Sequence, residues 1–302
     1  KRFLRQFRPQ LGILMETEIW FNLIHACRET GAPLLLLNAR MSEKSARGYA
    51  RFAHLTRNAL NKLAAVAAQT ADDAARLSDL GAPNVTVMGN LKFDIEPPAD
   101  MLELGKRLRE QFGAVRKVLI AASTREGEEA LLLDAVKEAR IADLLLVIVP
   151  RHPQRFTEVA NLIEQRGFPF QRRSENRVVP ADIQVVLGDS MGEMFAYYAS
   201  ADLAFIGGSL LPYGGQNLIE SCAVGTPVLA GPHTRNFAEA TRLAVSAGAA
   251  LQVRDAAEVM VESQRLLEDP KALQQMRLKC ARFVELNRGA TDKAVQIVVS
   301  VM

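Results

Sequence analysis

Pro33-Leu34-Leu35-Leu36-Leu37-Asn38 is a run of four leucines between a proline and a polar residue. An apolar run of this length with a polar end is typical of a strand buried on both faces, as in a parallel sheet. Residues 144–149, Leu144-Leu145-Leu146-Val147-Ile148-Val149, have the same character. We therefore expect parallel strands whose two faces are covered by helices.

Strand-like runs alternate with helical stretches on either side of these two. Ser42 and Thr70 are expected to cap helices, since a hydroxyl at that position accepts a hydrogen bond from the first turn. Strands separated by helices imply an α/β protein with parallel sheets. The expected strands cover residues 12–15, 33–38, the later part of 63–69, 85–88, 117–121, 144–149, 183–187, 202–206, 227–230 and 249–253.

Residues 94–100, Asp-Ile-Glu-Pro-Pro-Ala-Asp, are polar and rich in proline, so we expect them to link two domains. The predicted domains are residues 1–93 and residues 94–302, the second with terminal helices. About four strands precede the link and about six follow it, whereas an intact open α/β domain usually has five or six. Because the chain also starts at Lys1, we expect the first domain to lack its opening strands.

Composition and charge exclude several classes of protein. The 37 Lys and Arg residues are interspersed with 34 Asp and Glu residues, whereas a nucleic-acid-binding protein usually clusters its basic residues. We therefore expect no nucleic acid partner. Cys27, Cys222 and Cys280 lie far apart, without the spacing of a zinc site or a disulfide framework. No apolar run approaches the ~18 residues that a membrane-spanning helix needs.

The opening segment Lys1-Arg2-Phe3-Leu4-Arg5-Gln6-Phe7-Arg8 is basic and carries no negative charge. Its apolar residues are close to helical spacing, which suits an anionic membrane surface. The alternative is an ordinary, partly solvated helix. The sequence leaves both open.

Ligands of open α/β sheets bind beyond the carboxyl ends of the strands. After the expected strand 202–206, two pairs of glycines lead into Asn217 and Glu220. Glycines allow close backbone approach to an anion at a helix start, and Asn217 and Glu220 are suited to ribose hydroxyls. The alternative is a tight turn with a carboxylate that favours the helix dipole.

Three further loops of the second half follow expected strands. Arg151 comes after a very apolar strand, where a guanidinium suits a phosphate or a base, although it could also be a surface charge. Residues 188–193, Gly-Asp-Ser-Met-Gly-Glu, provide main-chain donors at a helix start, or simply a cap at Asp189 or Ser190. Residues 122–125, Ala-Ser-Thr-Arg, supply hydroxyls and an arginine. Together the four loops predict a nucleotide site.

Acidic and basic residues follow strands in the first half as well. Glu16 and Glu18 come after one strand, and Lys92 comes after another. If they point into a cleft between the domains, they can offset charge that develops in a transition state. The alternative is an acid cluster at a helix start and a lysine in a linker. The four histidines show no ligand spacing, and neither GxGxxG nor a Walker loop is present.

The chain resembles the 3-deoxy-D-manno-octulosonic acid (Kdo) transferases, which add Kdo to a lipid A precursor of lipopolysaccharide in Gram-negative bacteria. The similarity covers essentially the whole chain and rests on seven segments in the same order, none of which is specific alone. They are residues 15–20 (METEIW), 38–42 (NARMS), 89–94 (GNLKFD), 149–153 (VPRHP), 188–193 (GDSMGE), 205–210 (FIGGSL) and 231–237 (GPHTRNF).

This resemblance implies a GT-B fold, with two Rossmann-like domains facing a cleft. It also implies an inverting, metal-independent transfer from CMP-Kdo to a lipid A precursor, without a cofactor, at the cytoplasmic face of the inner membrane. Glu16 and Lys92 fall where the family stabilises the transition state. The residues that fall where it binds CMP are Pro150, Arg151, Met191, Gly192, Glu193, Asn217, Leu218, Ile219 and Glu220.

The chain departs from the family in two respects. The family's general base, a glutamate in a Ser-Val-Gly-Glu segment, and its membrane anchor are not in these 302 residues. Since loss of a positioned base commonly lowers the rate ~10²–10⁴-fold, we expect this fragment alone to bind CMP but to transfer Kdo weakly or not at all. In addition, Gln216 stands where histidine is common, and Leu218 stands where the family usually has proline.

Two other functions stay open at this point. A different GT-B enzyme, a UDP-sugar transferase or an epimerase, would bind UDP-sugars in preference to CMP. A non-catalytic nucleotide-binding module would bind its ligand without turnover.

Overall fold

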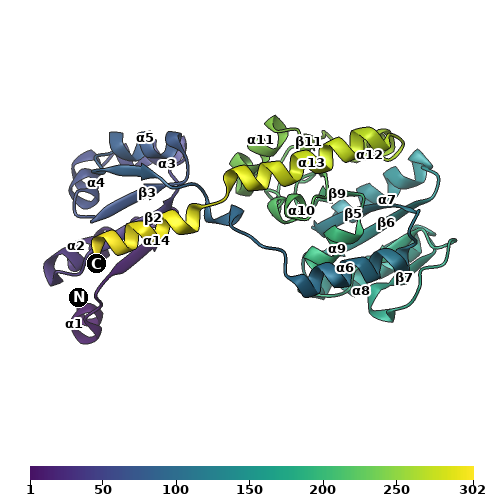
Figure 1. Cartoon of the computed structure of the whole chain (residues 1–302), viewed down its shortest axis with the longest axis horizontal. Helices are drawn as coiled ribbons and strands as arrows, with labels where there is room; N and C mark the ends of the chain where they lie inside the picture. Colours follow the sequence, from purple (N-terminus) through teal and green to yellow (C-terminus); the bar gives the residue numbers. More distant parts are fainter. The chain divides into compact units, whose positions relative to one another are not determined.

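The computed structural model describes residues 1–302 and divides into two compact units (Figure 1). Unit 1 consists of Lys1–Asp94 together with Asn287–Met302, and unit 2 of Ile95–Leu286. Each unit is built around one sheet in which every pair of neighbouring strands is parallel. The predicted α/β architecture with two parallel sheets is confirmed.

Unit 1 has a four-stranded sheet in the order β1-β2-β3-β4. As expected, Ser42 and Thr70 cap α3 and α5, each hydroxyl accepting a backbone N–H of the first turn. The elements before the link are α1 (Arg2–Phe7), β1 (Gly12–Met15), α2 (Phe21–Thr30), β2 (Leu34–Ala39), α3 (Glu43–Ala50), α4 (Ala53–Leu60), β3 (Ala65–Ala68), α5 (Ala71–Asp79), β4 (Val85–Val87) and the 3₁₀ turn η1 (Leu91–Phe93).

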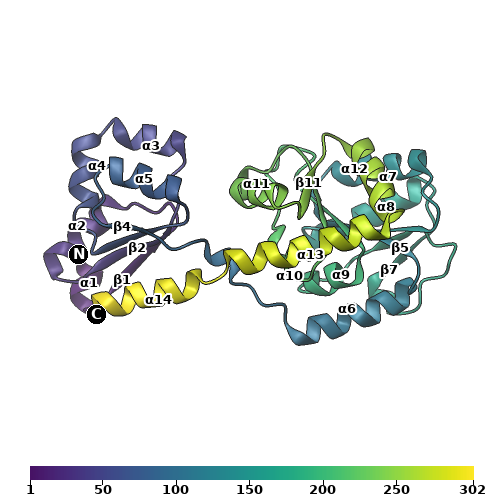
Figure 2. The ribbon, with the colours of Figure 1, turned by 45° about the horizontal axis from the view of Figure 1, so that its top comes forward.

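The four leucines at 34–37 form the buried centre of this sheet. Their alternating side chains enter two different cores, because successive residues of a strand point to opposite faces. Leu34 and Leu36 join the core formed with α2, α4 and α5, whereas Leu35 and Leu37 pack against α14 (Ala290–Val301). Figure 2 shows α14 lying along the sheet.

The predicted domain boundary, after residue 93, lies one residue from the boundary between the two units. The last residues of the chain, however, belong to a different unit from the one predicted. Residues 287–302 belong to unit 1 rather than to the second domain. Asp94 holds the start of α14, since its carboxylate accepts the N–H groups of Gly289 and Thr291. The apolar face of α14, including Ile297 and Val298, covers β2 and β3.

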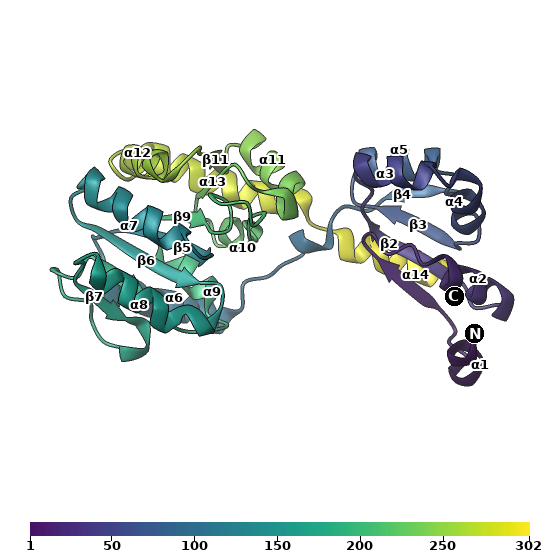
Figure 3. The same ribbon diagram turned by 180° about the vertical axis from the view of Figure 1, so that it is seen from behind.

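Unit 2 has a seven-stranded sheet in the order β11-β10-β9-β5-β6-β8-β7 (Figure 3). Its elements are α6 (Ala99–Phe112), β5 (Lys117–Thr124), α7 (Glu128–Ala139), β6 (Leu144–Pro150), η2 (Pro153–Arg155), α8 (Phe156–Gln165), β7 (Phe170–Arg172), η3 (Arg173–Glu175), β8 (Val185–Leu187), α9 (Met194–Ser200), β9 (Leu203–Ile206), α10 (Ile219–Ala223), β10 (Val228–Ala230), η4 (Arg235–Phe237), α11 (Ala238–Ser246), β11 (Ala250–Gln252), α12 (Ala256–Leu267) and α13 (Pro270–Asn287).

The order of these strands reverses between β5 and β9. From β5 the chain builds β6, β7 and β8 toward one edge, and it then returns to place β9, β10 and β11 on the other side of β5. In open α/β sheets, ligands bind at the carboxyl ends of the strands next to such a reversal. The sequence predicted six strands here and missed β7, a three-residue edge strand.

None of the helices in the chain combines the length and the apolar character needed to cross a bilayer.

Candidate active site

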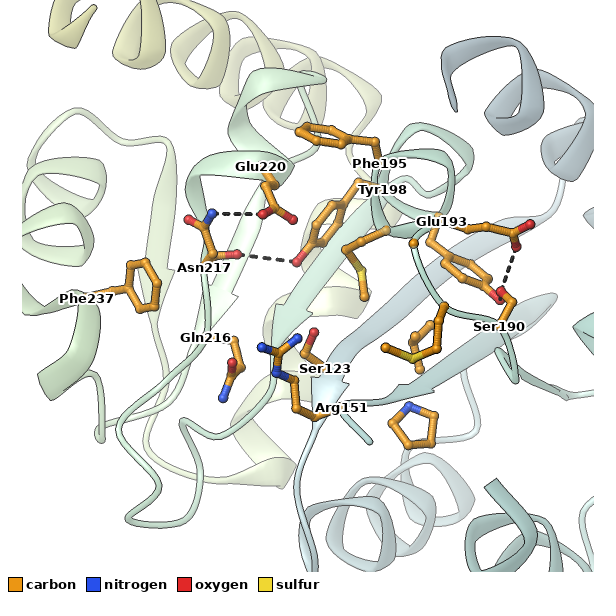
Figure 4. Close-up of a pocket in the computed structure, with 16 residues that line it drawn as sticks. Ser123, Arg151, Ser190, Glu193, Phe195, Tyr198, Gln216, Asn217, Glu220 and Phe237 are labelled. Carbon is orange, nitrogen blue, oxygen red and sulfur yellow. Dashed lines mark hydrogen bonds between the residues drawn. The ribbon is translucent and has the colours of Figure 1, made fainter. Parts of the chain in front are cut away.

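A pocket of about 380 Å³ lies at the carboxyl ends of the unit 2 strands (Figure 4). Its walls come mainly from the carboxyl ends of β5 and β6 and from the segments after β6, β8 and β9, all within or next to the four segments that the sequence singled out. Phe237, after β10, adds to them. The lining residues are Ser123, Val149, Pro150, Arg151, Ser190, Met191, Gly192, Glu193, Met194, Phe195, Tyr197, Tyr198, Gln216, Asn217, Glu220 and Phe237. Every predicted CMP-site residue except Leu218 and Ile219 is in this wall.

Leu218 and Ile219 lie beneath the pocket. Both side chains are buried, and the N–H of Ile219 donates to Oδ1 of Asn217 at 3.0 Å. They anchor the start of α10 in the core, which positions Asn217 and Glu220 at the surface of the pocket. Neither residue lines the pocket, and their assignment to the CMP site stays a prediction.

Asn217 and Glu220 form one side of the pocket. Nδ2 of Asn217 donates to Oε1 of Glu220 at 3.0 Å, and the Tyr198 hydroxyl donates to the carbonyl of Asn217 at 3.4 Å (Figure 4). Burial raises the pKa of Glu220, while the bond from Asn217 and the charge of Arg151 oppose the rise. The free carboxylate oxygen is available to accept hydrogen bonds from neighbouring hydroxyls of a ligand.

Arg151 brings a positive charge into the pocket. Its backbone N–H donates to the carbonyl of Thr124 at 3.0 Å, which ties the end of β6 to the end of β5. The guanidinium has five N–H donors in a planar fork that matches a phosphate or a carboxylate. The pocket therefore pairs an anion-binding group with the hydroxyl-binding group of Glu220.

The opposite side of the pocket is a hydrogen-bonded set around Glu193. Its Oε2 accepts from Ser190 Oγ at 2.6 Å, its Oε1 lies 3.3 Å from Nη2 of Arg173, and Ser190 Oγ lies 2.7 Å from the Tyr197 hydroxyl. Burial raises the pKa of Tyr197 well above its usual value, so this hydroxyl stays neutral. Ser190 does not cap α9, because it bonds to Glu193 and Tyr197 instead.

The first pair of glycines, Gly207 and Gly208, leads into backbone donors that are already occupied within the protein. The N–H groups of Gly208 and Leu210 donate to the carboxylate of Glu128, a fully buried residue at the start of α7. Sequence reasoning missed Glu128. One local feature of the sequence could have identified it. Glu128 lies three residues after Arg125 and accepts the N–H of Arg125, as the glutamate of a capping box does.

Glu16 and Lys92 come together in unit 1. Glu16 follows β1 directly and Lys92 lies in η1, and their side chains form an ion pair of 3.3 Å that is partly open to solvent. Glu16 has a φ of 58° and Asn38, at the end of β2, a φ of 50°. The left-handed conformation is unfavourable for residues other than glycine and is often found at functional sites.

Comparison with known proteins shows the family to which the chain belongs. Residues 1–95 match the family described as 3-deoxy-D-manno-octulosonic-acid transferase (kdotransferase), and residues 120–282 match glycosyl transferases group 1. A 3-deoxy-D-manno-octulosonic acid transferase of Bordetella pertussis is 42% identical over 301 residues, covering 98% of this chain and 70% of that protein. The chain belongs to the Kdo transferase family. A Haemophilus influenzae relative of the same name is 36% identical over 302 residues, with the same coverage.

Solved structures add the fold and a close relative of unit 2. The C-terminal CMP-Kdo binding domain of WaaA from Acinetobacter baumannii is 32% identical, with a TM-score of 0.59, and matches 63% of this Kdo transferase family member and all of that domain. Anabaena Alr3699/HepE in complex with UDP has a TM-score of 0.61 over 99% of the chain and 80% of its own length. At 15% identity the latter shows the fold alone. The chain is thus a glycosyltransferase of the GT-B fold.

The pocket contains aromatic residues that sequence reasoning did not assign to it. Phe195, Tyr197 and Tyr198 all come from α9, which follows the Gly-Asp-Ser-Met-Gly-Glu loop, and Phe237 comes from η4. One feature of the sequence could have indicated the aromatic residues of α9: they lie in the first turns of a helix that begins directly after a loop predicted to bind the ligand. No group of three or more His, Cys, Asp or Glu side chains in the chain is arranged to hold a metal ion.

Proposed function

We propose that this member of the Kdo transferase family transfers Kdo from CMP-Kdo to a lipid A precursor, with inversion at the anomeric carbon and without a metal ion. The observation that carries the proposal is the convergence of Arg151, Glu193 and Glu220 on one pocket at the strand reversal of unit 2. The 32% identity of this unit to a CMP-Kdo binding domain supports the same donor.

The chemistry of the pocket fits a cytidine monophosphate in three parts. Arg151 suits the phosphate, because a guanidinium forms strong charge-assisted hydrogen bonds to phosphate oxygens. Glu220 suits the two ribose hydroxyls as an acceptor. The side formed by Met191, Gly192 and Glu193 remains for the base, which the apolar Met191 side chain and the backbone can contact.

Glu16 and Lys92 suit the charges of the reaction itself. An acceptor hydroxyl attacks the anomeric carbon and gives up its proton to a general base while the bond to the phosphate of CMP breaks. Negative charge therefore grows on the departing phosphate and positive charge on the sugar ring. A lysine offsets the first charge and a carboxylate the second, and such preorganised groups commonly contribute ~10²–10³-fold in rate. Their contact across 3.3 Å keeps both in place before the substrate binds.

The acceptor is a lipid, and α1 offers a surface for an anionic bilayer at the cytoplasmic face of the inner membrane. Phe3 and Phe7 are both 64% exposed, and their rings lie 4.7 Å apart on one side of the helix. Arg2 and Arg5 are exposed on the same short helix. Exposed aromatic rings beside basic residues bind the interface of anionic membranes.

Calorimetric titration of the chain with CMP, UMP and UDP tests the donor. We expect CMP to bind at least about tenfold more tightly than UMP or UDP. Preference for UDP would contradict the proposal and favour a UDP-sugar enzyme. Release of CMP from CMP-Kdo on a lipid A precursor, measured with the full gene product, tests turnover, and its absence would favour a non-catalytic nucleotide-binding module.

Binding to lipid vesicles tests the membrane surface separately. We expect the chain to sediment with vesicles that contain an anionic phospholipid and not with purely zwitterionic ones. Replacement of Phe3 and Phe7 by serine is expected to abolish that binding and to leave the affinity for CMP unchanged. Equal binding by the doubly substituted chain would contradict the role of α1.

A further inference from the structure

Glu128 joins the two loops between which the strand order of unit 2 reverses. Its Oε2 accepts the N–H of Gly208 at 2.6 Å and of Arg125 at 2.9 Å, and its Oε1 accepts the N–H of Leu210 at 2.9 Å. Arg125 follows β5, whereas Gly208 and Leu210 follow β9. The bond to Arg125 is local, but the other two connect segments about 80 residues apart in the chain.

The end of β5 and the loop after β9 both contribute to the wall of the proposed donor pocket. Ser123, near the carboxyl end of β5, lines the pocket. In the loop after β9, the carbonyl of Gly208 accepts the N–H of Gly215 at 2.7 Å, and the next two residues, Gln216 and Asn217, line the pocket. The position of Gly208 therefore influences two lining residues.

The loop after β9 touches the end of β5 backbone to backbone at Gly207. A Cβ atom at this residue would lie 2.5 Å from the carbonyl oxygen of Ser123 and 2.6 Å from Cα of Thr124. Thr124 in turn receives the backbone N–H of Arg151. A shift of the loop after β9 would thus be transmitted to Ser123 and toward Arg151.

We propose that Glu128 is a positioning residue for donor binding, which holds the loops after β5 and β9 together and thereby sets Ser123, Gln216 and Asn217 in the pocket. The role of these residues toward CMP rests on the proposed function. An ionised carboxylate suits this task because it is an acceptor only and can satisfy all three N–H groups at once. A glutamine cannot, since its amide nitrogen places N–H donors against the backbone donors.

Asp202 provides a matched control at the other end of the same strands. Its carboxylate accepts the N–H of Val118 at the start of β5 and pairs with Arg109 and Arg277. It is a partly buried acid in a comparable network, but at the amino ends of β5 and β9, away from the pocket. Loss of Asp202 tests general destabilisation of the sheet.

The experiment compares Glu128→Gln with Asp202→Asn in three measurements. These are the calorimetric affinity for CMP, the backbone amide exchange of Gly208 and Leu210 by NMR, and the donor KM and kcat of the full gene product. For Glu128→Gln we expect the Kd for CMP and the donor KM to rise at least about tenfold, with kcat changed less than about threefold. The amides of Gly208 and Leu210 should lose protection. Asp202→Asn should leave the Kd for CMP, the donor KM, the kcat and the protection of these two amides within about twofold of the values for the unsubstituted chain.

Two results would overturn the role of Glu128. One is a folded Glu128→Gln chain that binds CMP within about twofold of the unsubstituted chain, and the other is an equal loss of affinity in Asp202→Asn.

If Glu128→Gln does not fold, Glu128→Asp retains the charge on a shorter side chain and should show a smaller loss of the same kind. An unsubstituted chain that fails to bind CMP would refute the proposed donor. In that case, retained protection of Gly208 and Leu210 in Glu128→Gln would refute the role of Glu128 and lost protection would support it.

Discussion

Nζ of Lys92 lies 3.3 Å from Oε1 of Glu16, although the strands that precede them, β4 and β1, are at opposite edges of the unit 1 sheet. The pair forms because η1 returns over the carboxyl ends of the strands between them. Asn38 fixes this return. Its side-chain oxygen accepts the N–H of Leu91 at 3.2 Å, and its own N–H contacts the sulfur of Met88.

Loss of the Lys92 ammonium should affect the transfer step and not the affinity for nucleotide. We expect Lys92→Met and Glu16→Gln each to lower the kcat of the full gene product by about 10²-fold or more, since each removes a charge proposed to act in the transition state. The affinity for CMP should stay within about twofold, because the donor pocket lies in unit 2. Lys62→Met is the control, because Lys62 is a lysine of the same unit whose ammonium pairs with His25 at the surface. An unchanged kcat in Lys92→Met would contradict the catalytic role.

Arg151 should recognise the phosphate and not the nucleoside. Hydrogen bonds to charged groups contribute about 1.5–3 kcal/mol, so Arg151→Ala should weaken CMP binding about 10–100-fold. Competition by cytidine, which has no phosphate, should change less than about threefold. Arg265→Ala serves as the control, since this arginine pairs with Glu262 on α12. Equal losses for CMP and cytidine would show that Arg151 acts on the shape of the pocket instead.

Much of this arrangement could be predicted from the sequence, because the deciding signals are local. Apolar runs such as 34–37 and 144–149 identify buried strands, and Arg151, two residues after the second run, marks the edge of the sheet where the pocket lies. Ser42 and Thr70 mark helix starts by the chemistry of their hydroxyls. Seven of the residues predicted to bind CMP line one pocket, because the segments that carry them follow parallel strands whose carboxyl ends share one edge of the sheet.

What could not be predicted depends on contacts between distant segments. Glu128 appears as an ordinary acid at a helix start until β9 is placed beside β5. β7 has only three residues and an unremarkable composition, so no period of two could identify it. Asp94 appeared to belong to a linker because its partners, Gly289 and Thr291, are nearly 200 residues away.

Binding of CMP should depend on the ionisation of Glu220. Burial raises the pKa of this carboxyl above its ordinary value of 4.5, and the bond from Asn217 and the charge of Arg151 only oppose that rise. As the pH falls toward this raised pKa, Glu220 becomes protonated and loses its ability to accept two hydroxyls at once. We therefore expect the affinity for CMP to fall between neutral pH and about pH 5, as measured by calorimetry.

Glu220→Gln separates this effect from protonation of the CMP phosphate. The substituted chain should bind CMP more weakly at pH 7.5 and should show a smaller decline toward pH 5, because only the phosphate still titrates. Parallel declines in the two proteins would mean that Glu220 is not the group whose ionisation matters.

Asp94 should stabilise unit 1 by holding the start of α14. Burial raises its pKa, but the hydrogen bonds from Thr291 and Gly289 outweigh burial and lower the pKa below its ordinary value of 3.8. A lowered pKa means that its contribution is present above pH 4 and is lost as the pH falls through the folded-state pKa. Loss of a helix cap costs about 1 kcal/mol, so Asp94→Ala should lower the unfolding free energy of unit 1 by this amount at pH 7, with a smaller difference near pH 3.

Urea unfolding at the two pH values measures this loss of stability. Asp79→Ala, at an exposed acid at the end of α5, is the control. A difference between Asp94→Ala and the unsubstituted chain that stays constant with pH would show that the carboxylate charge is not what holds α14.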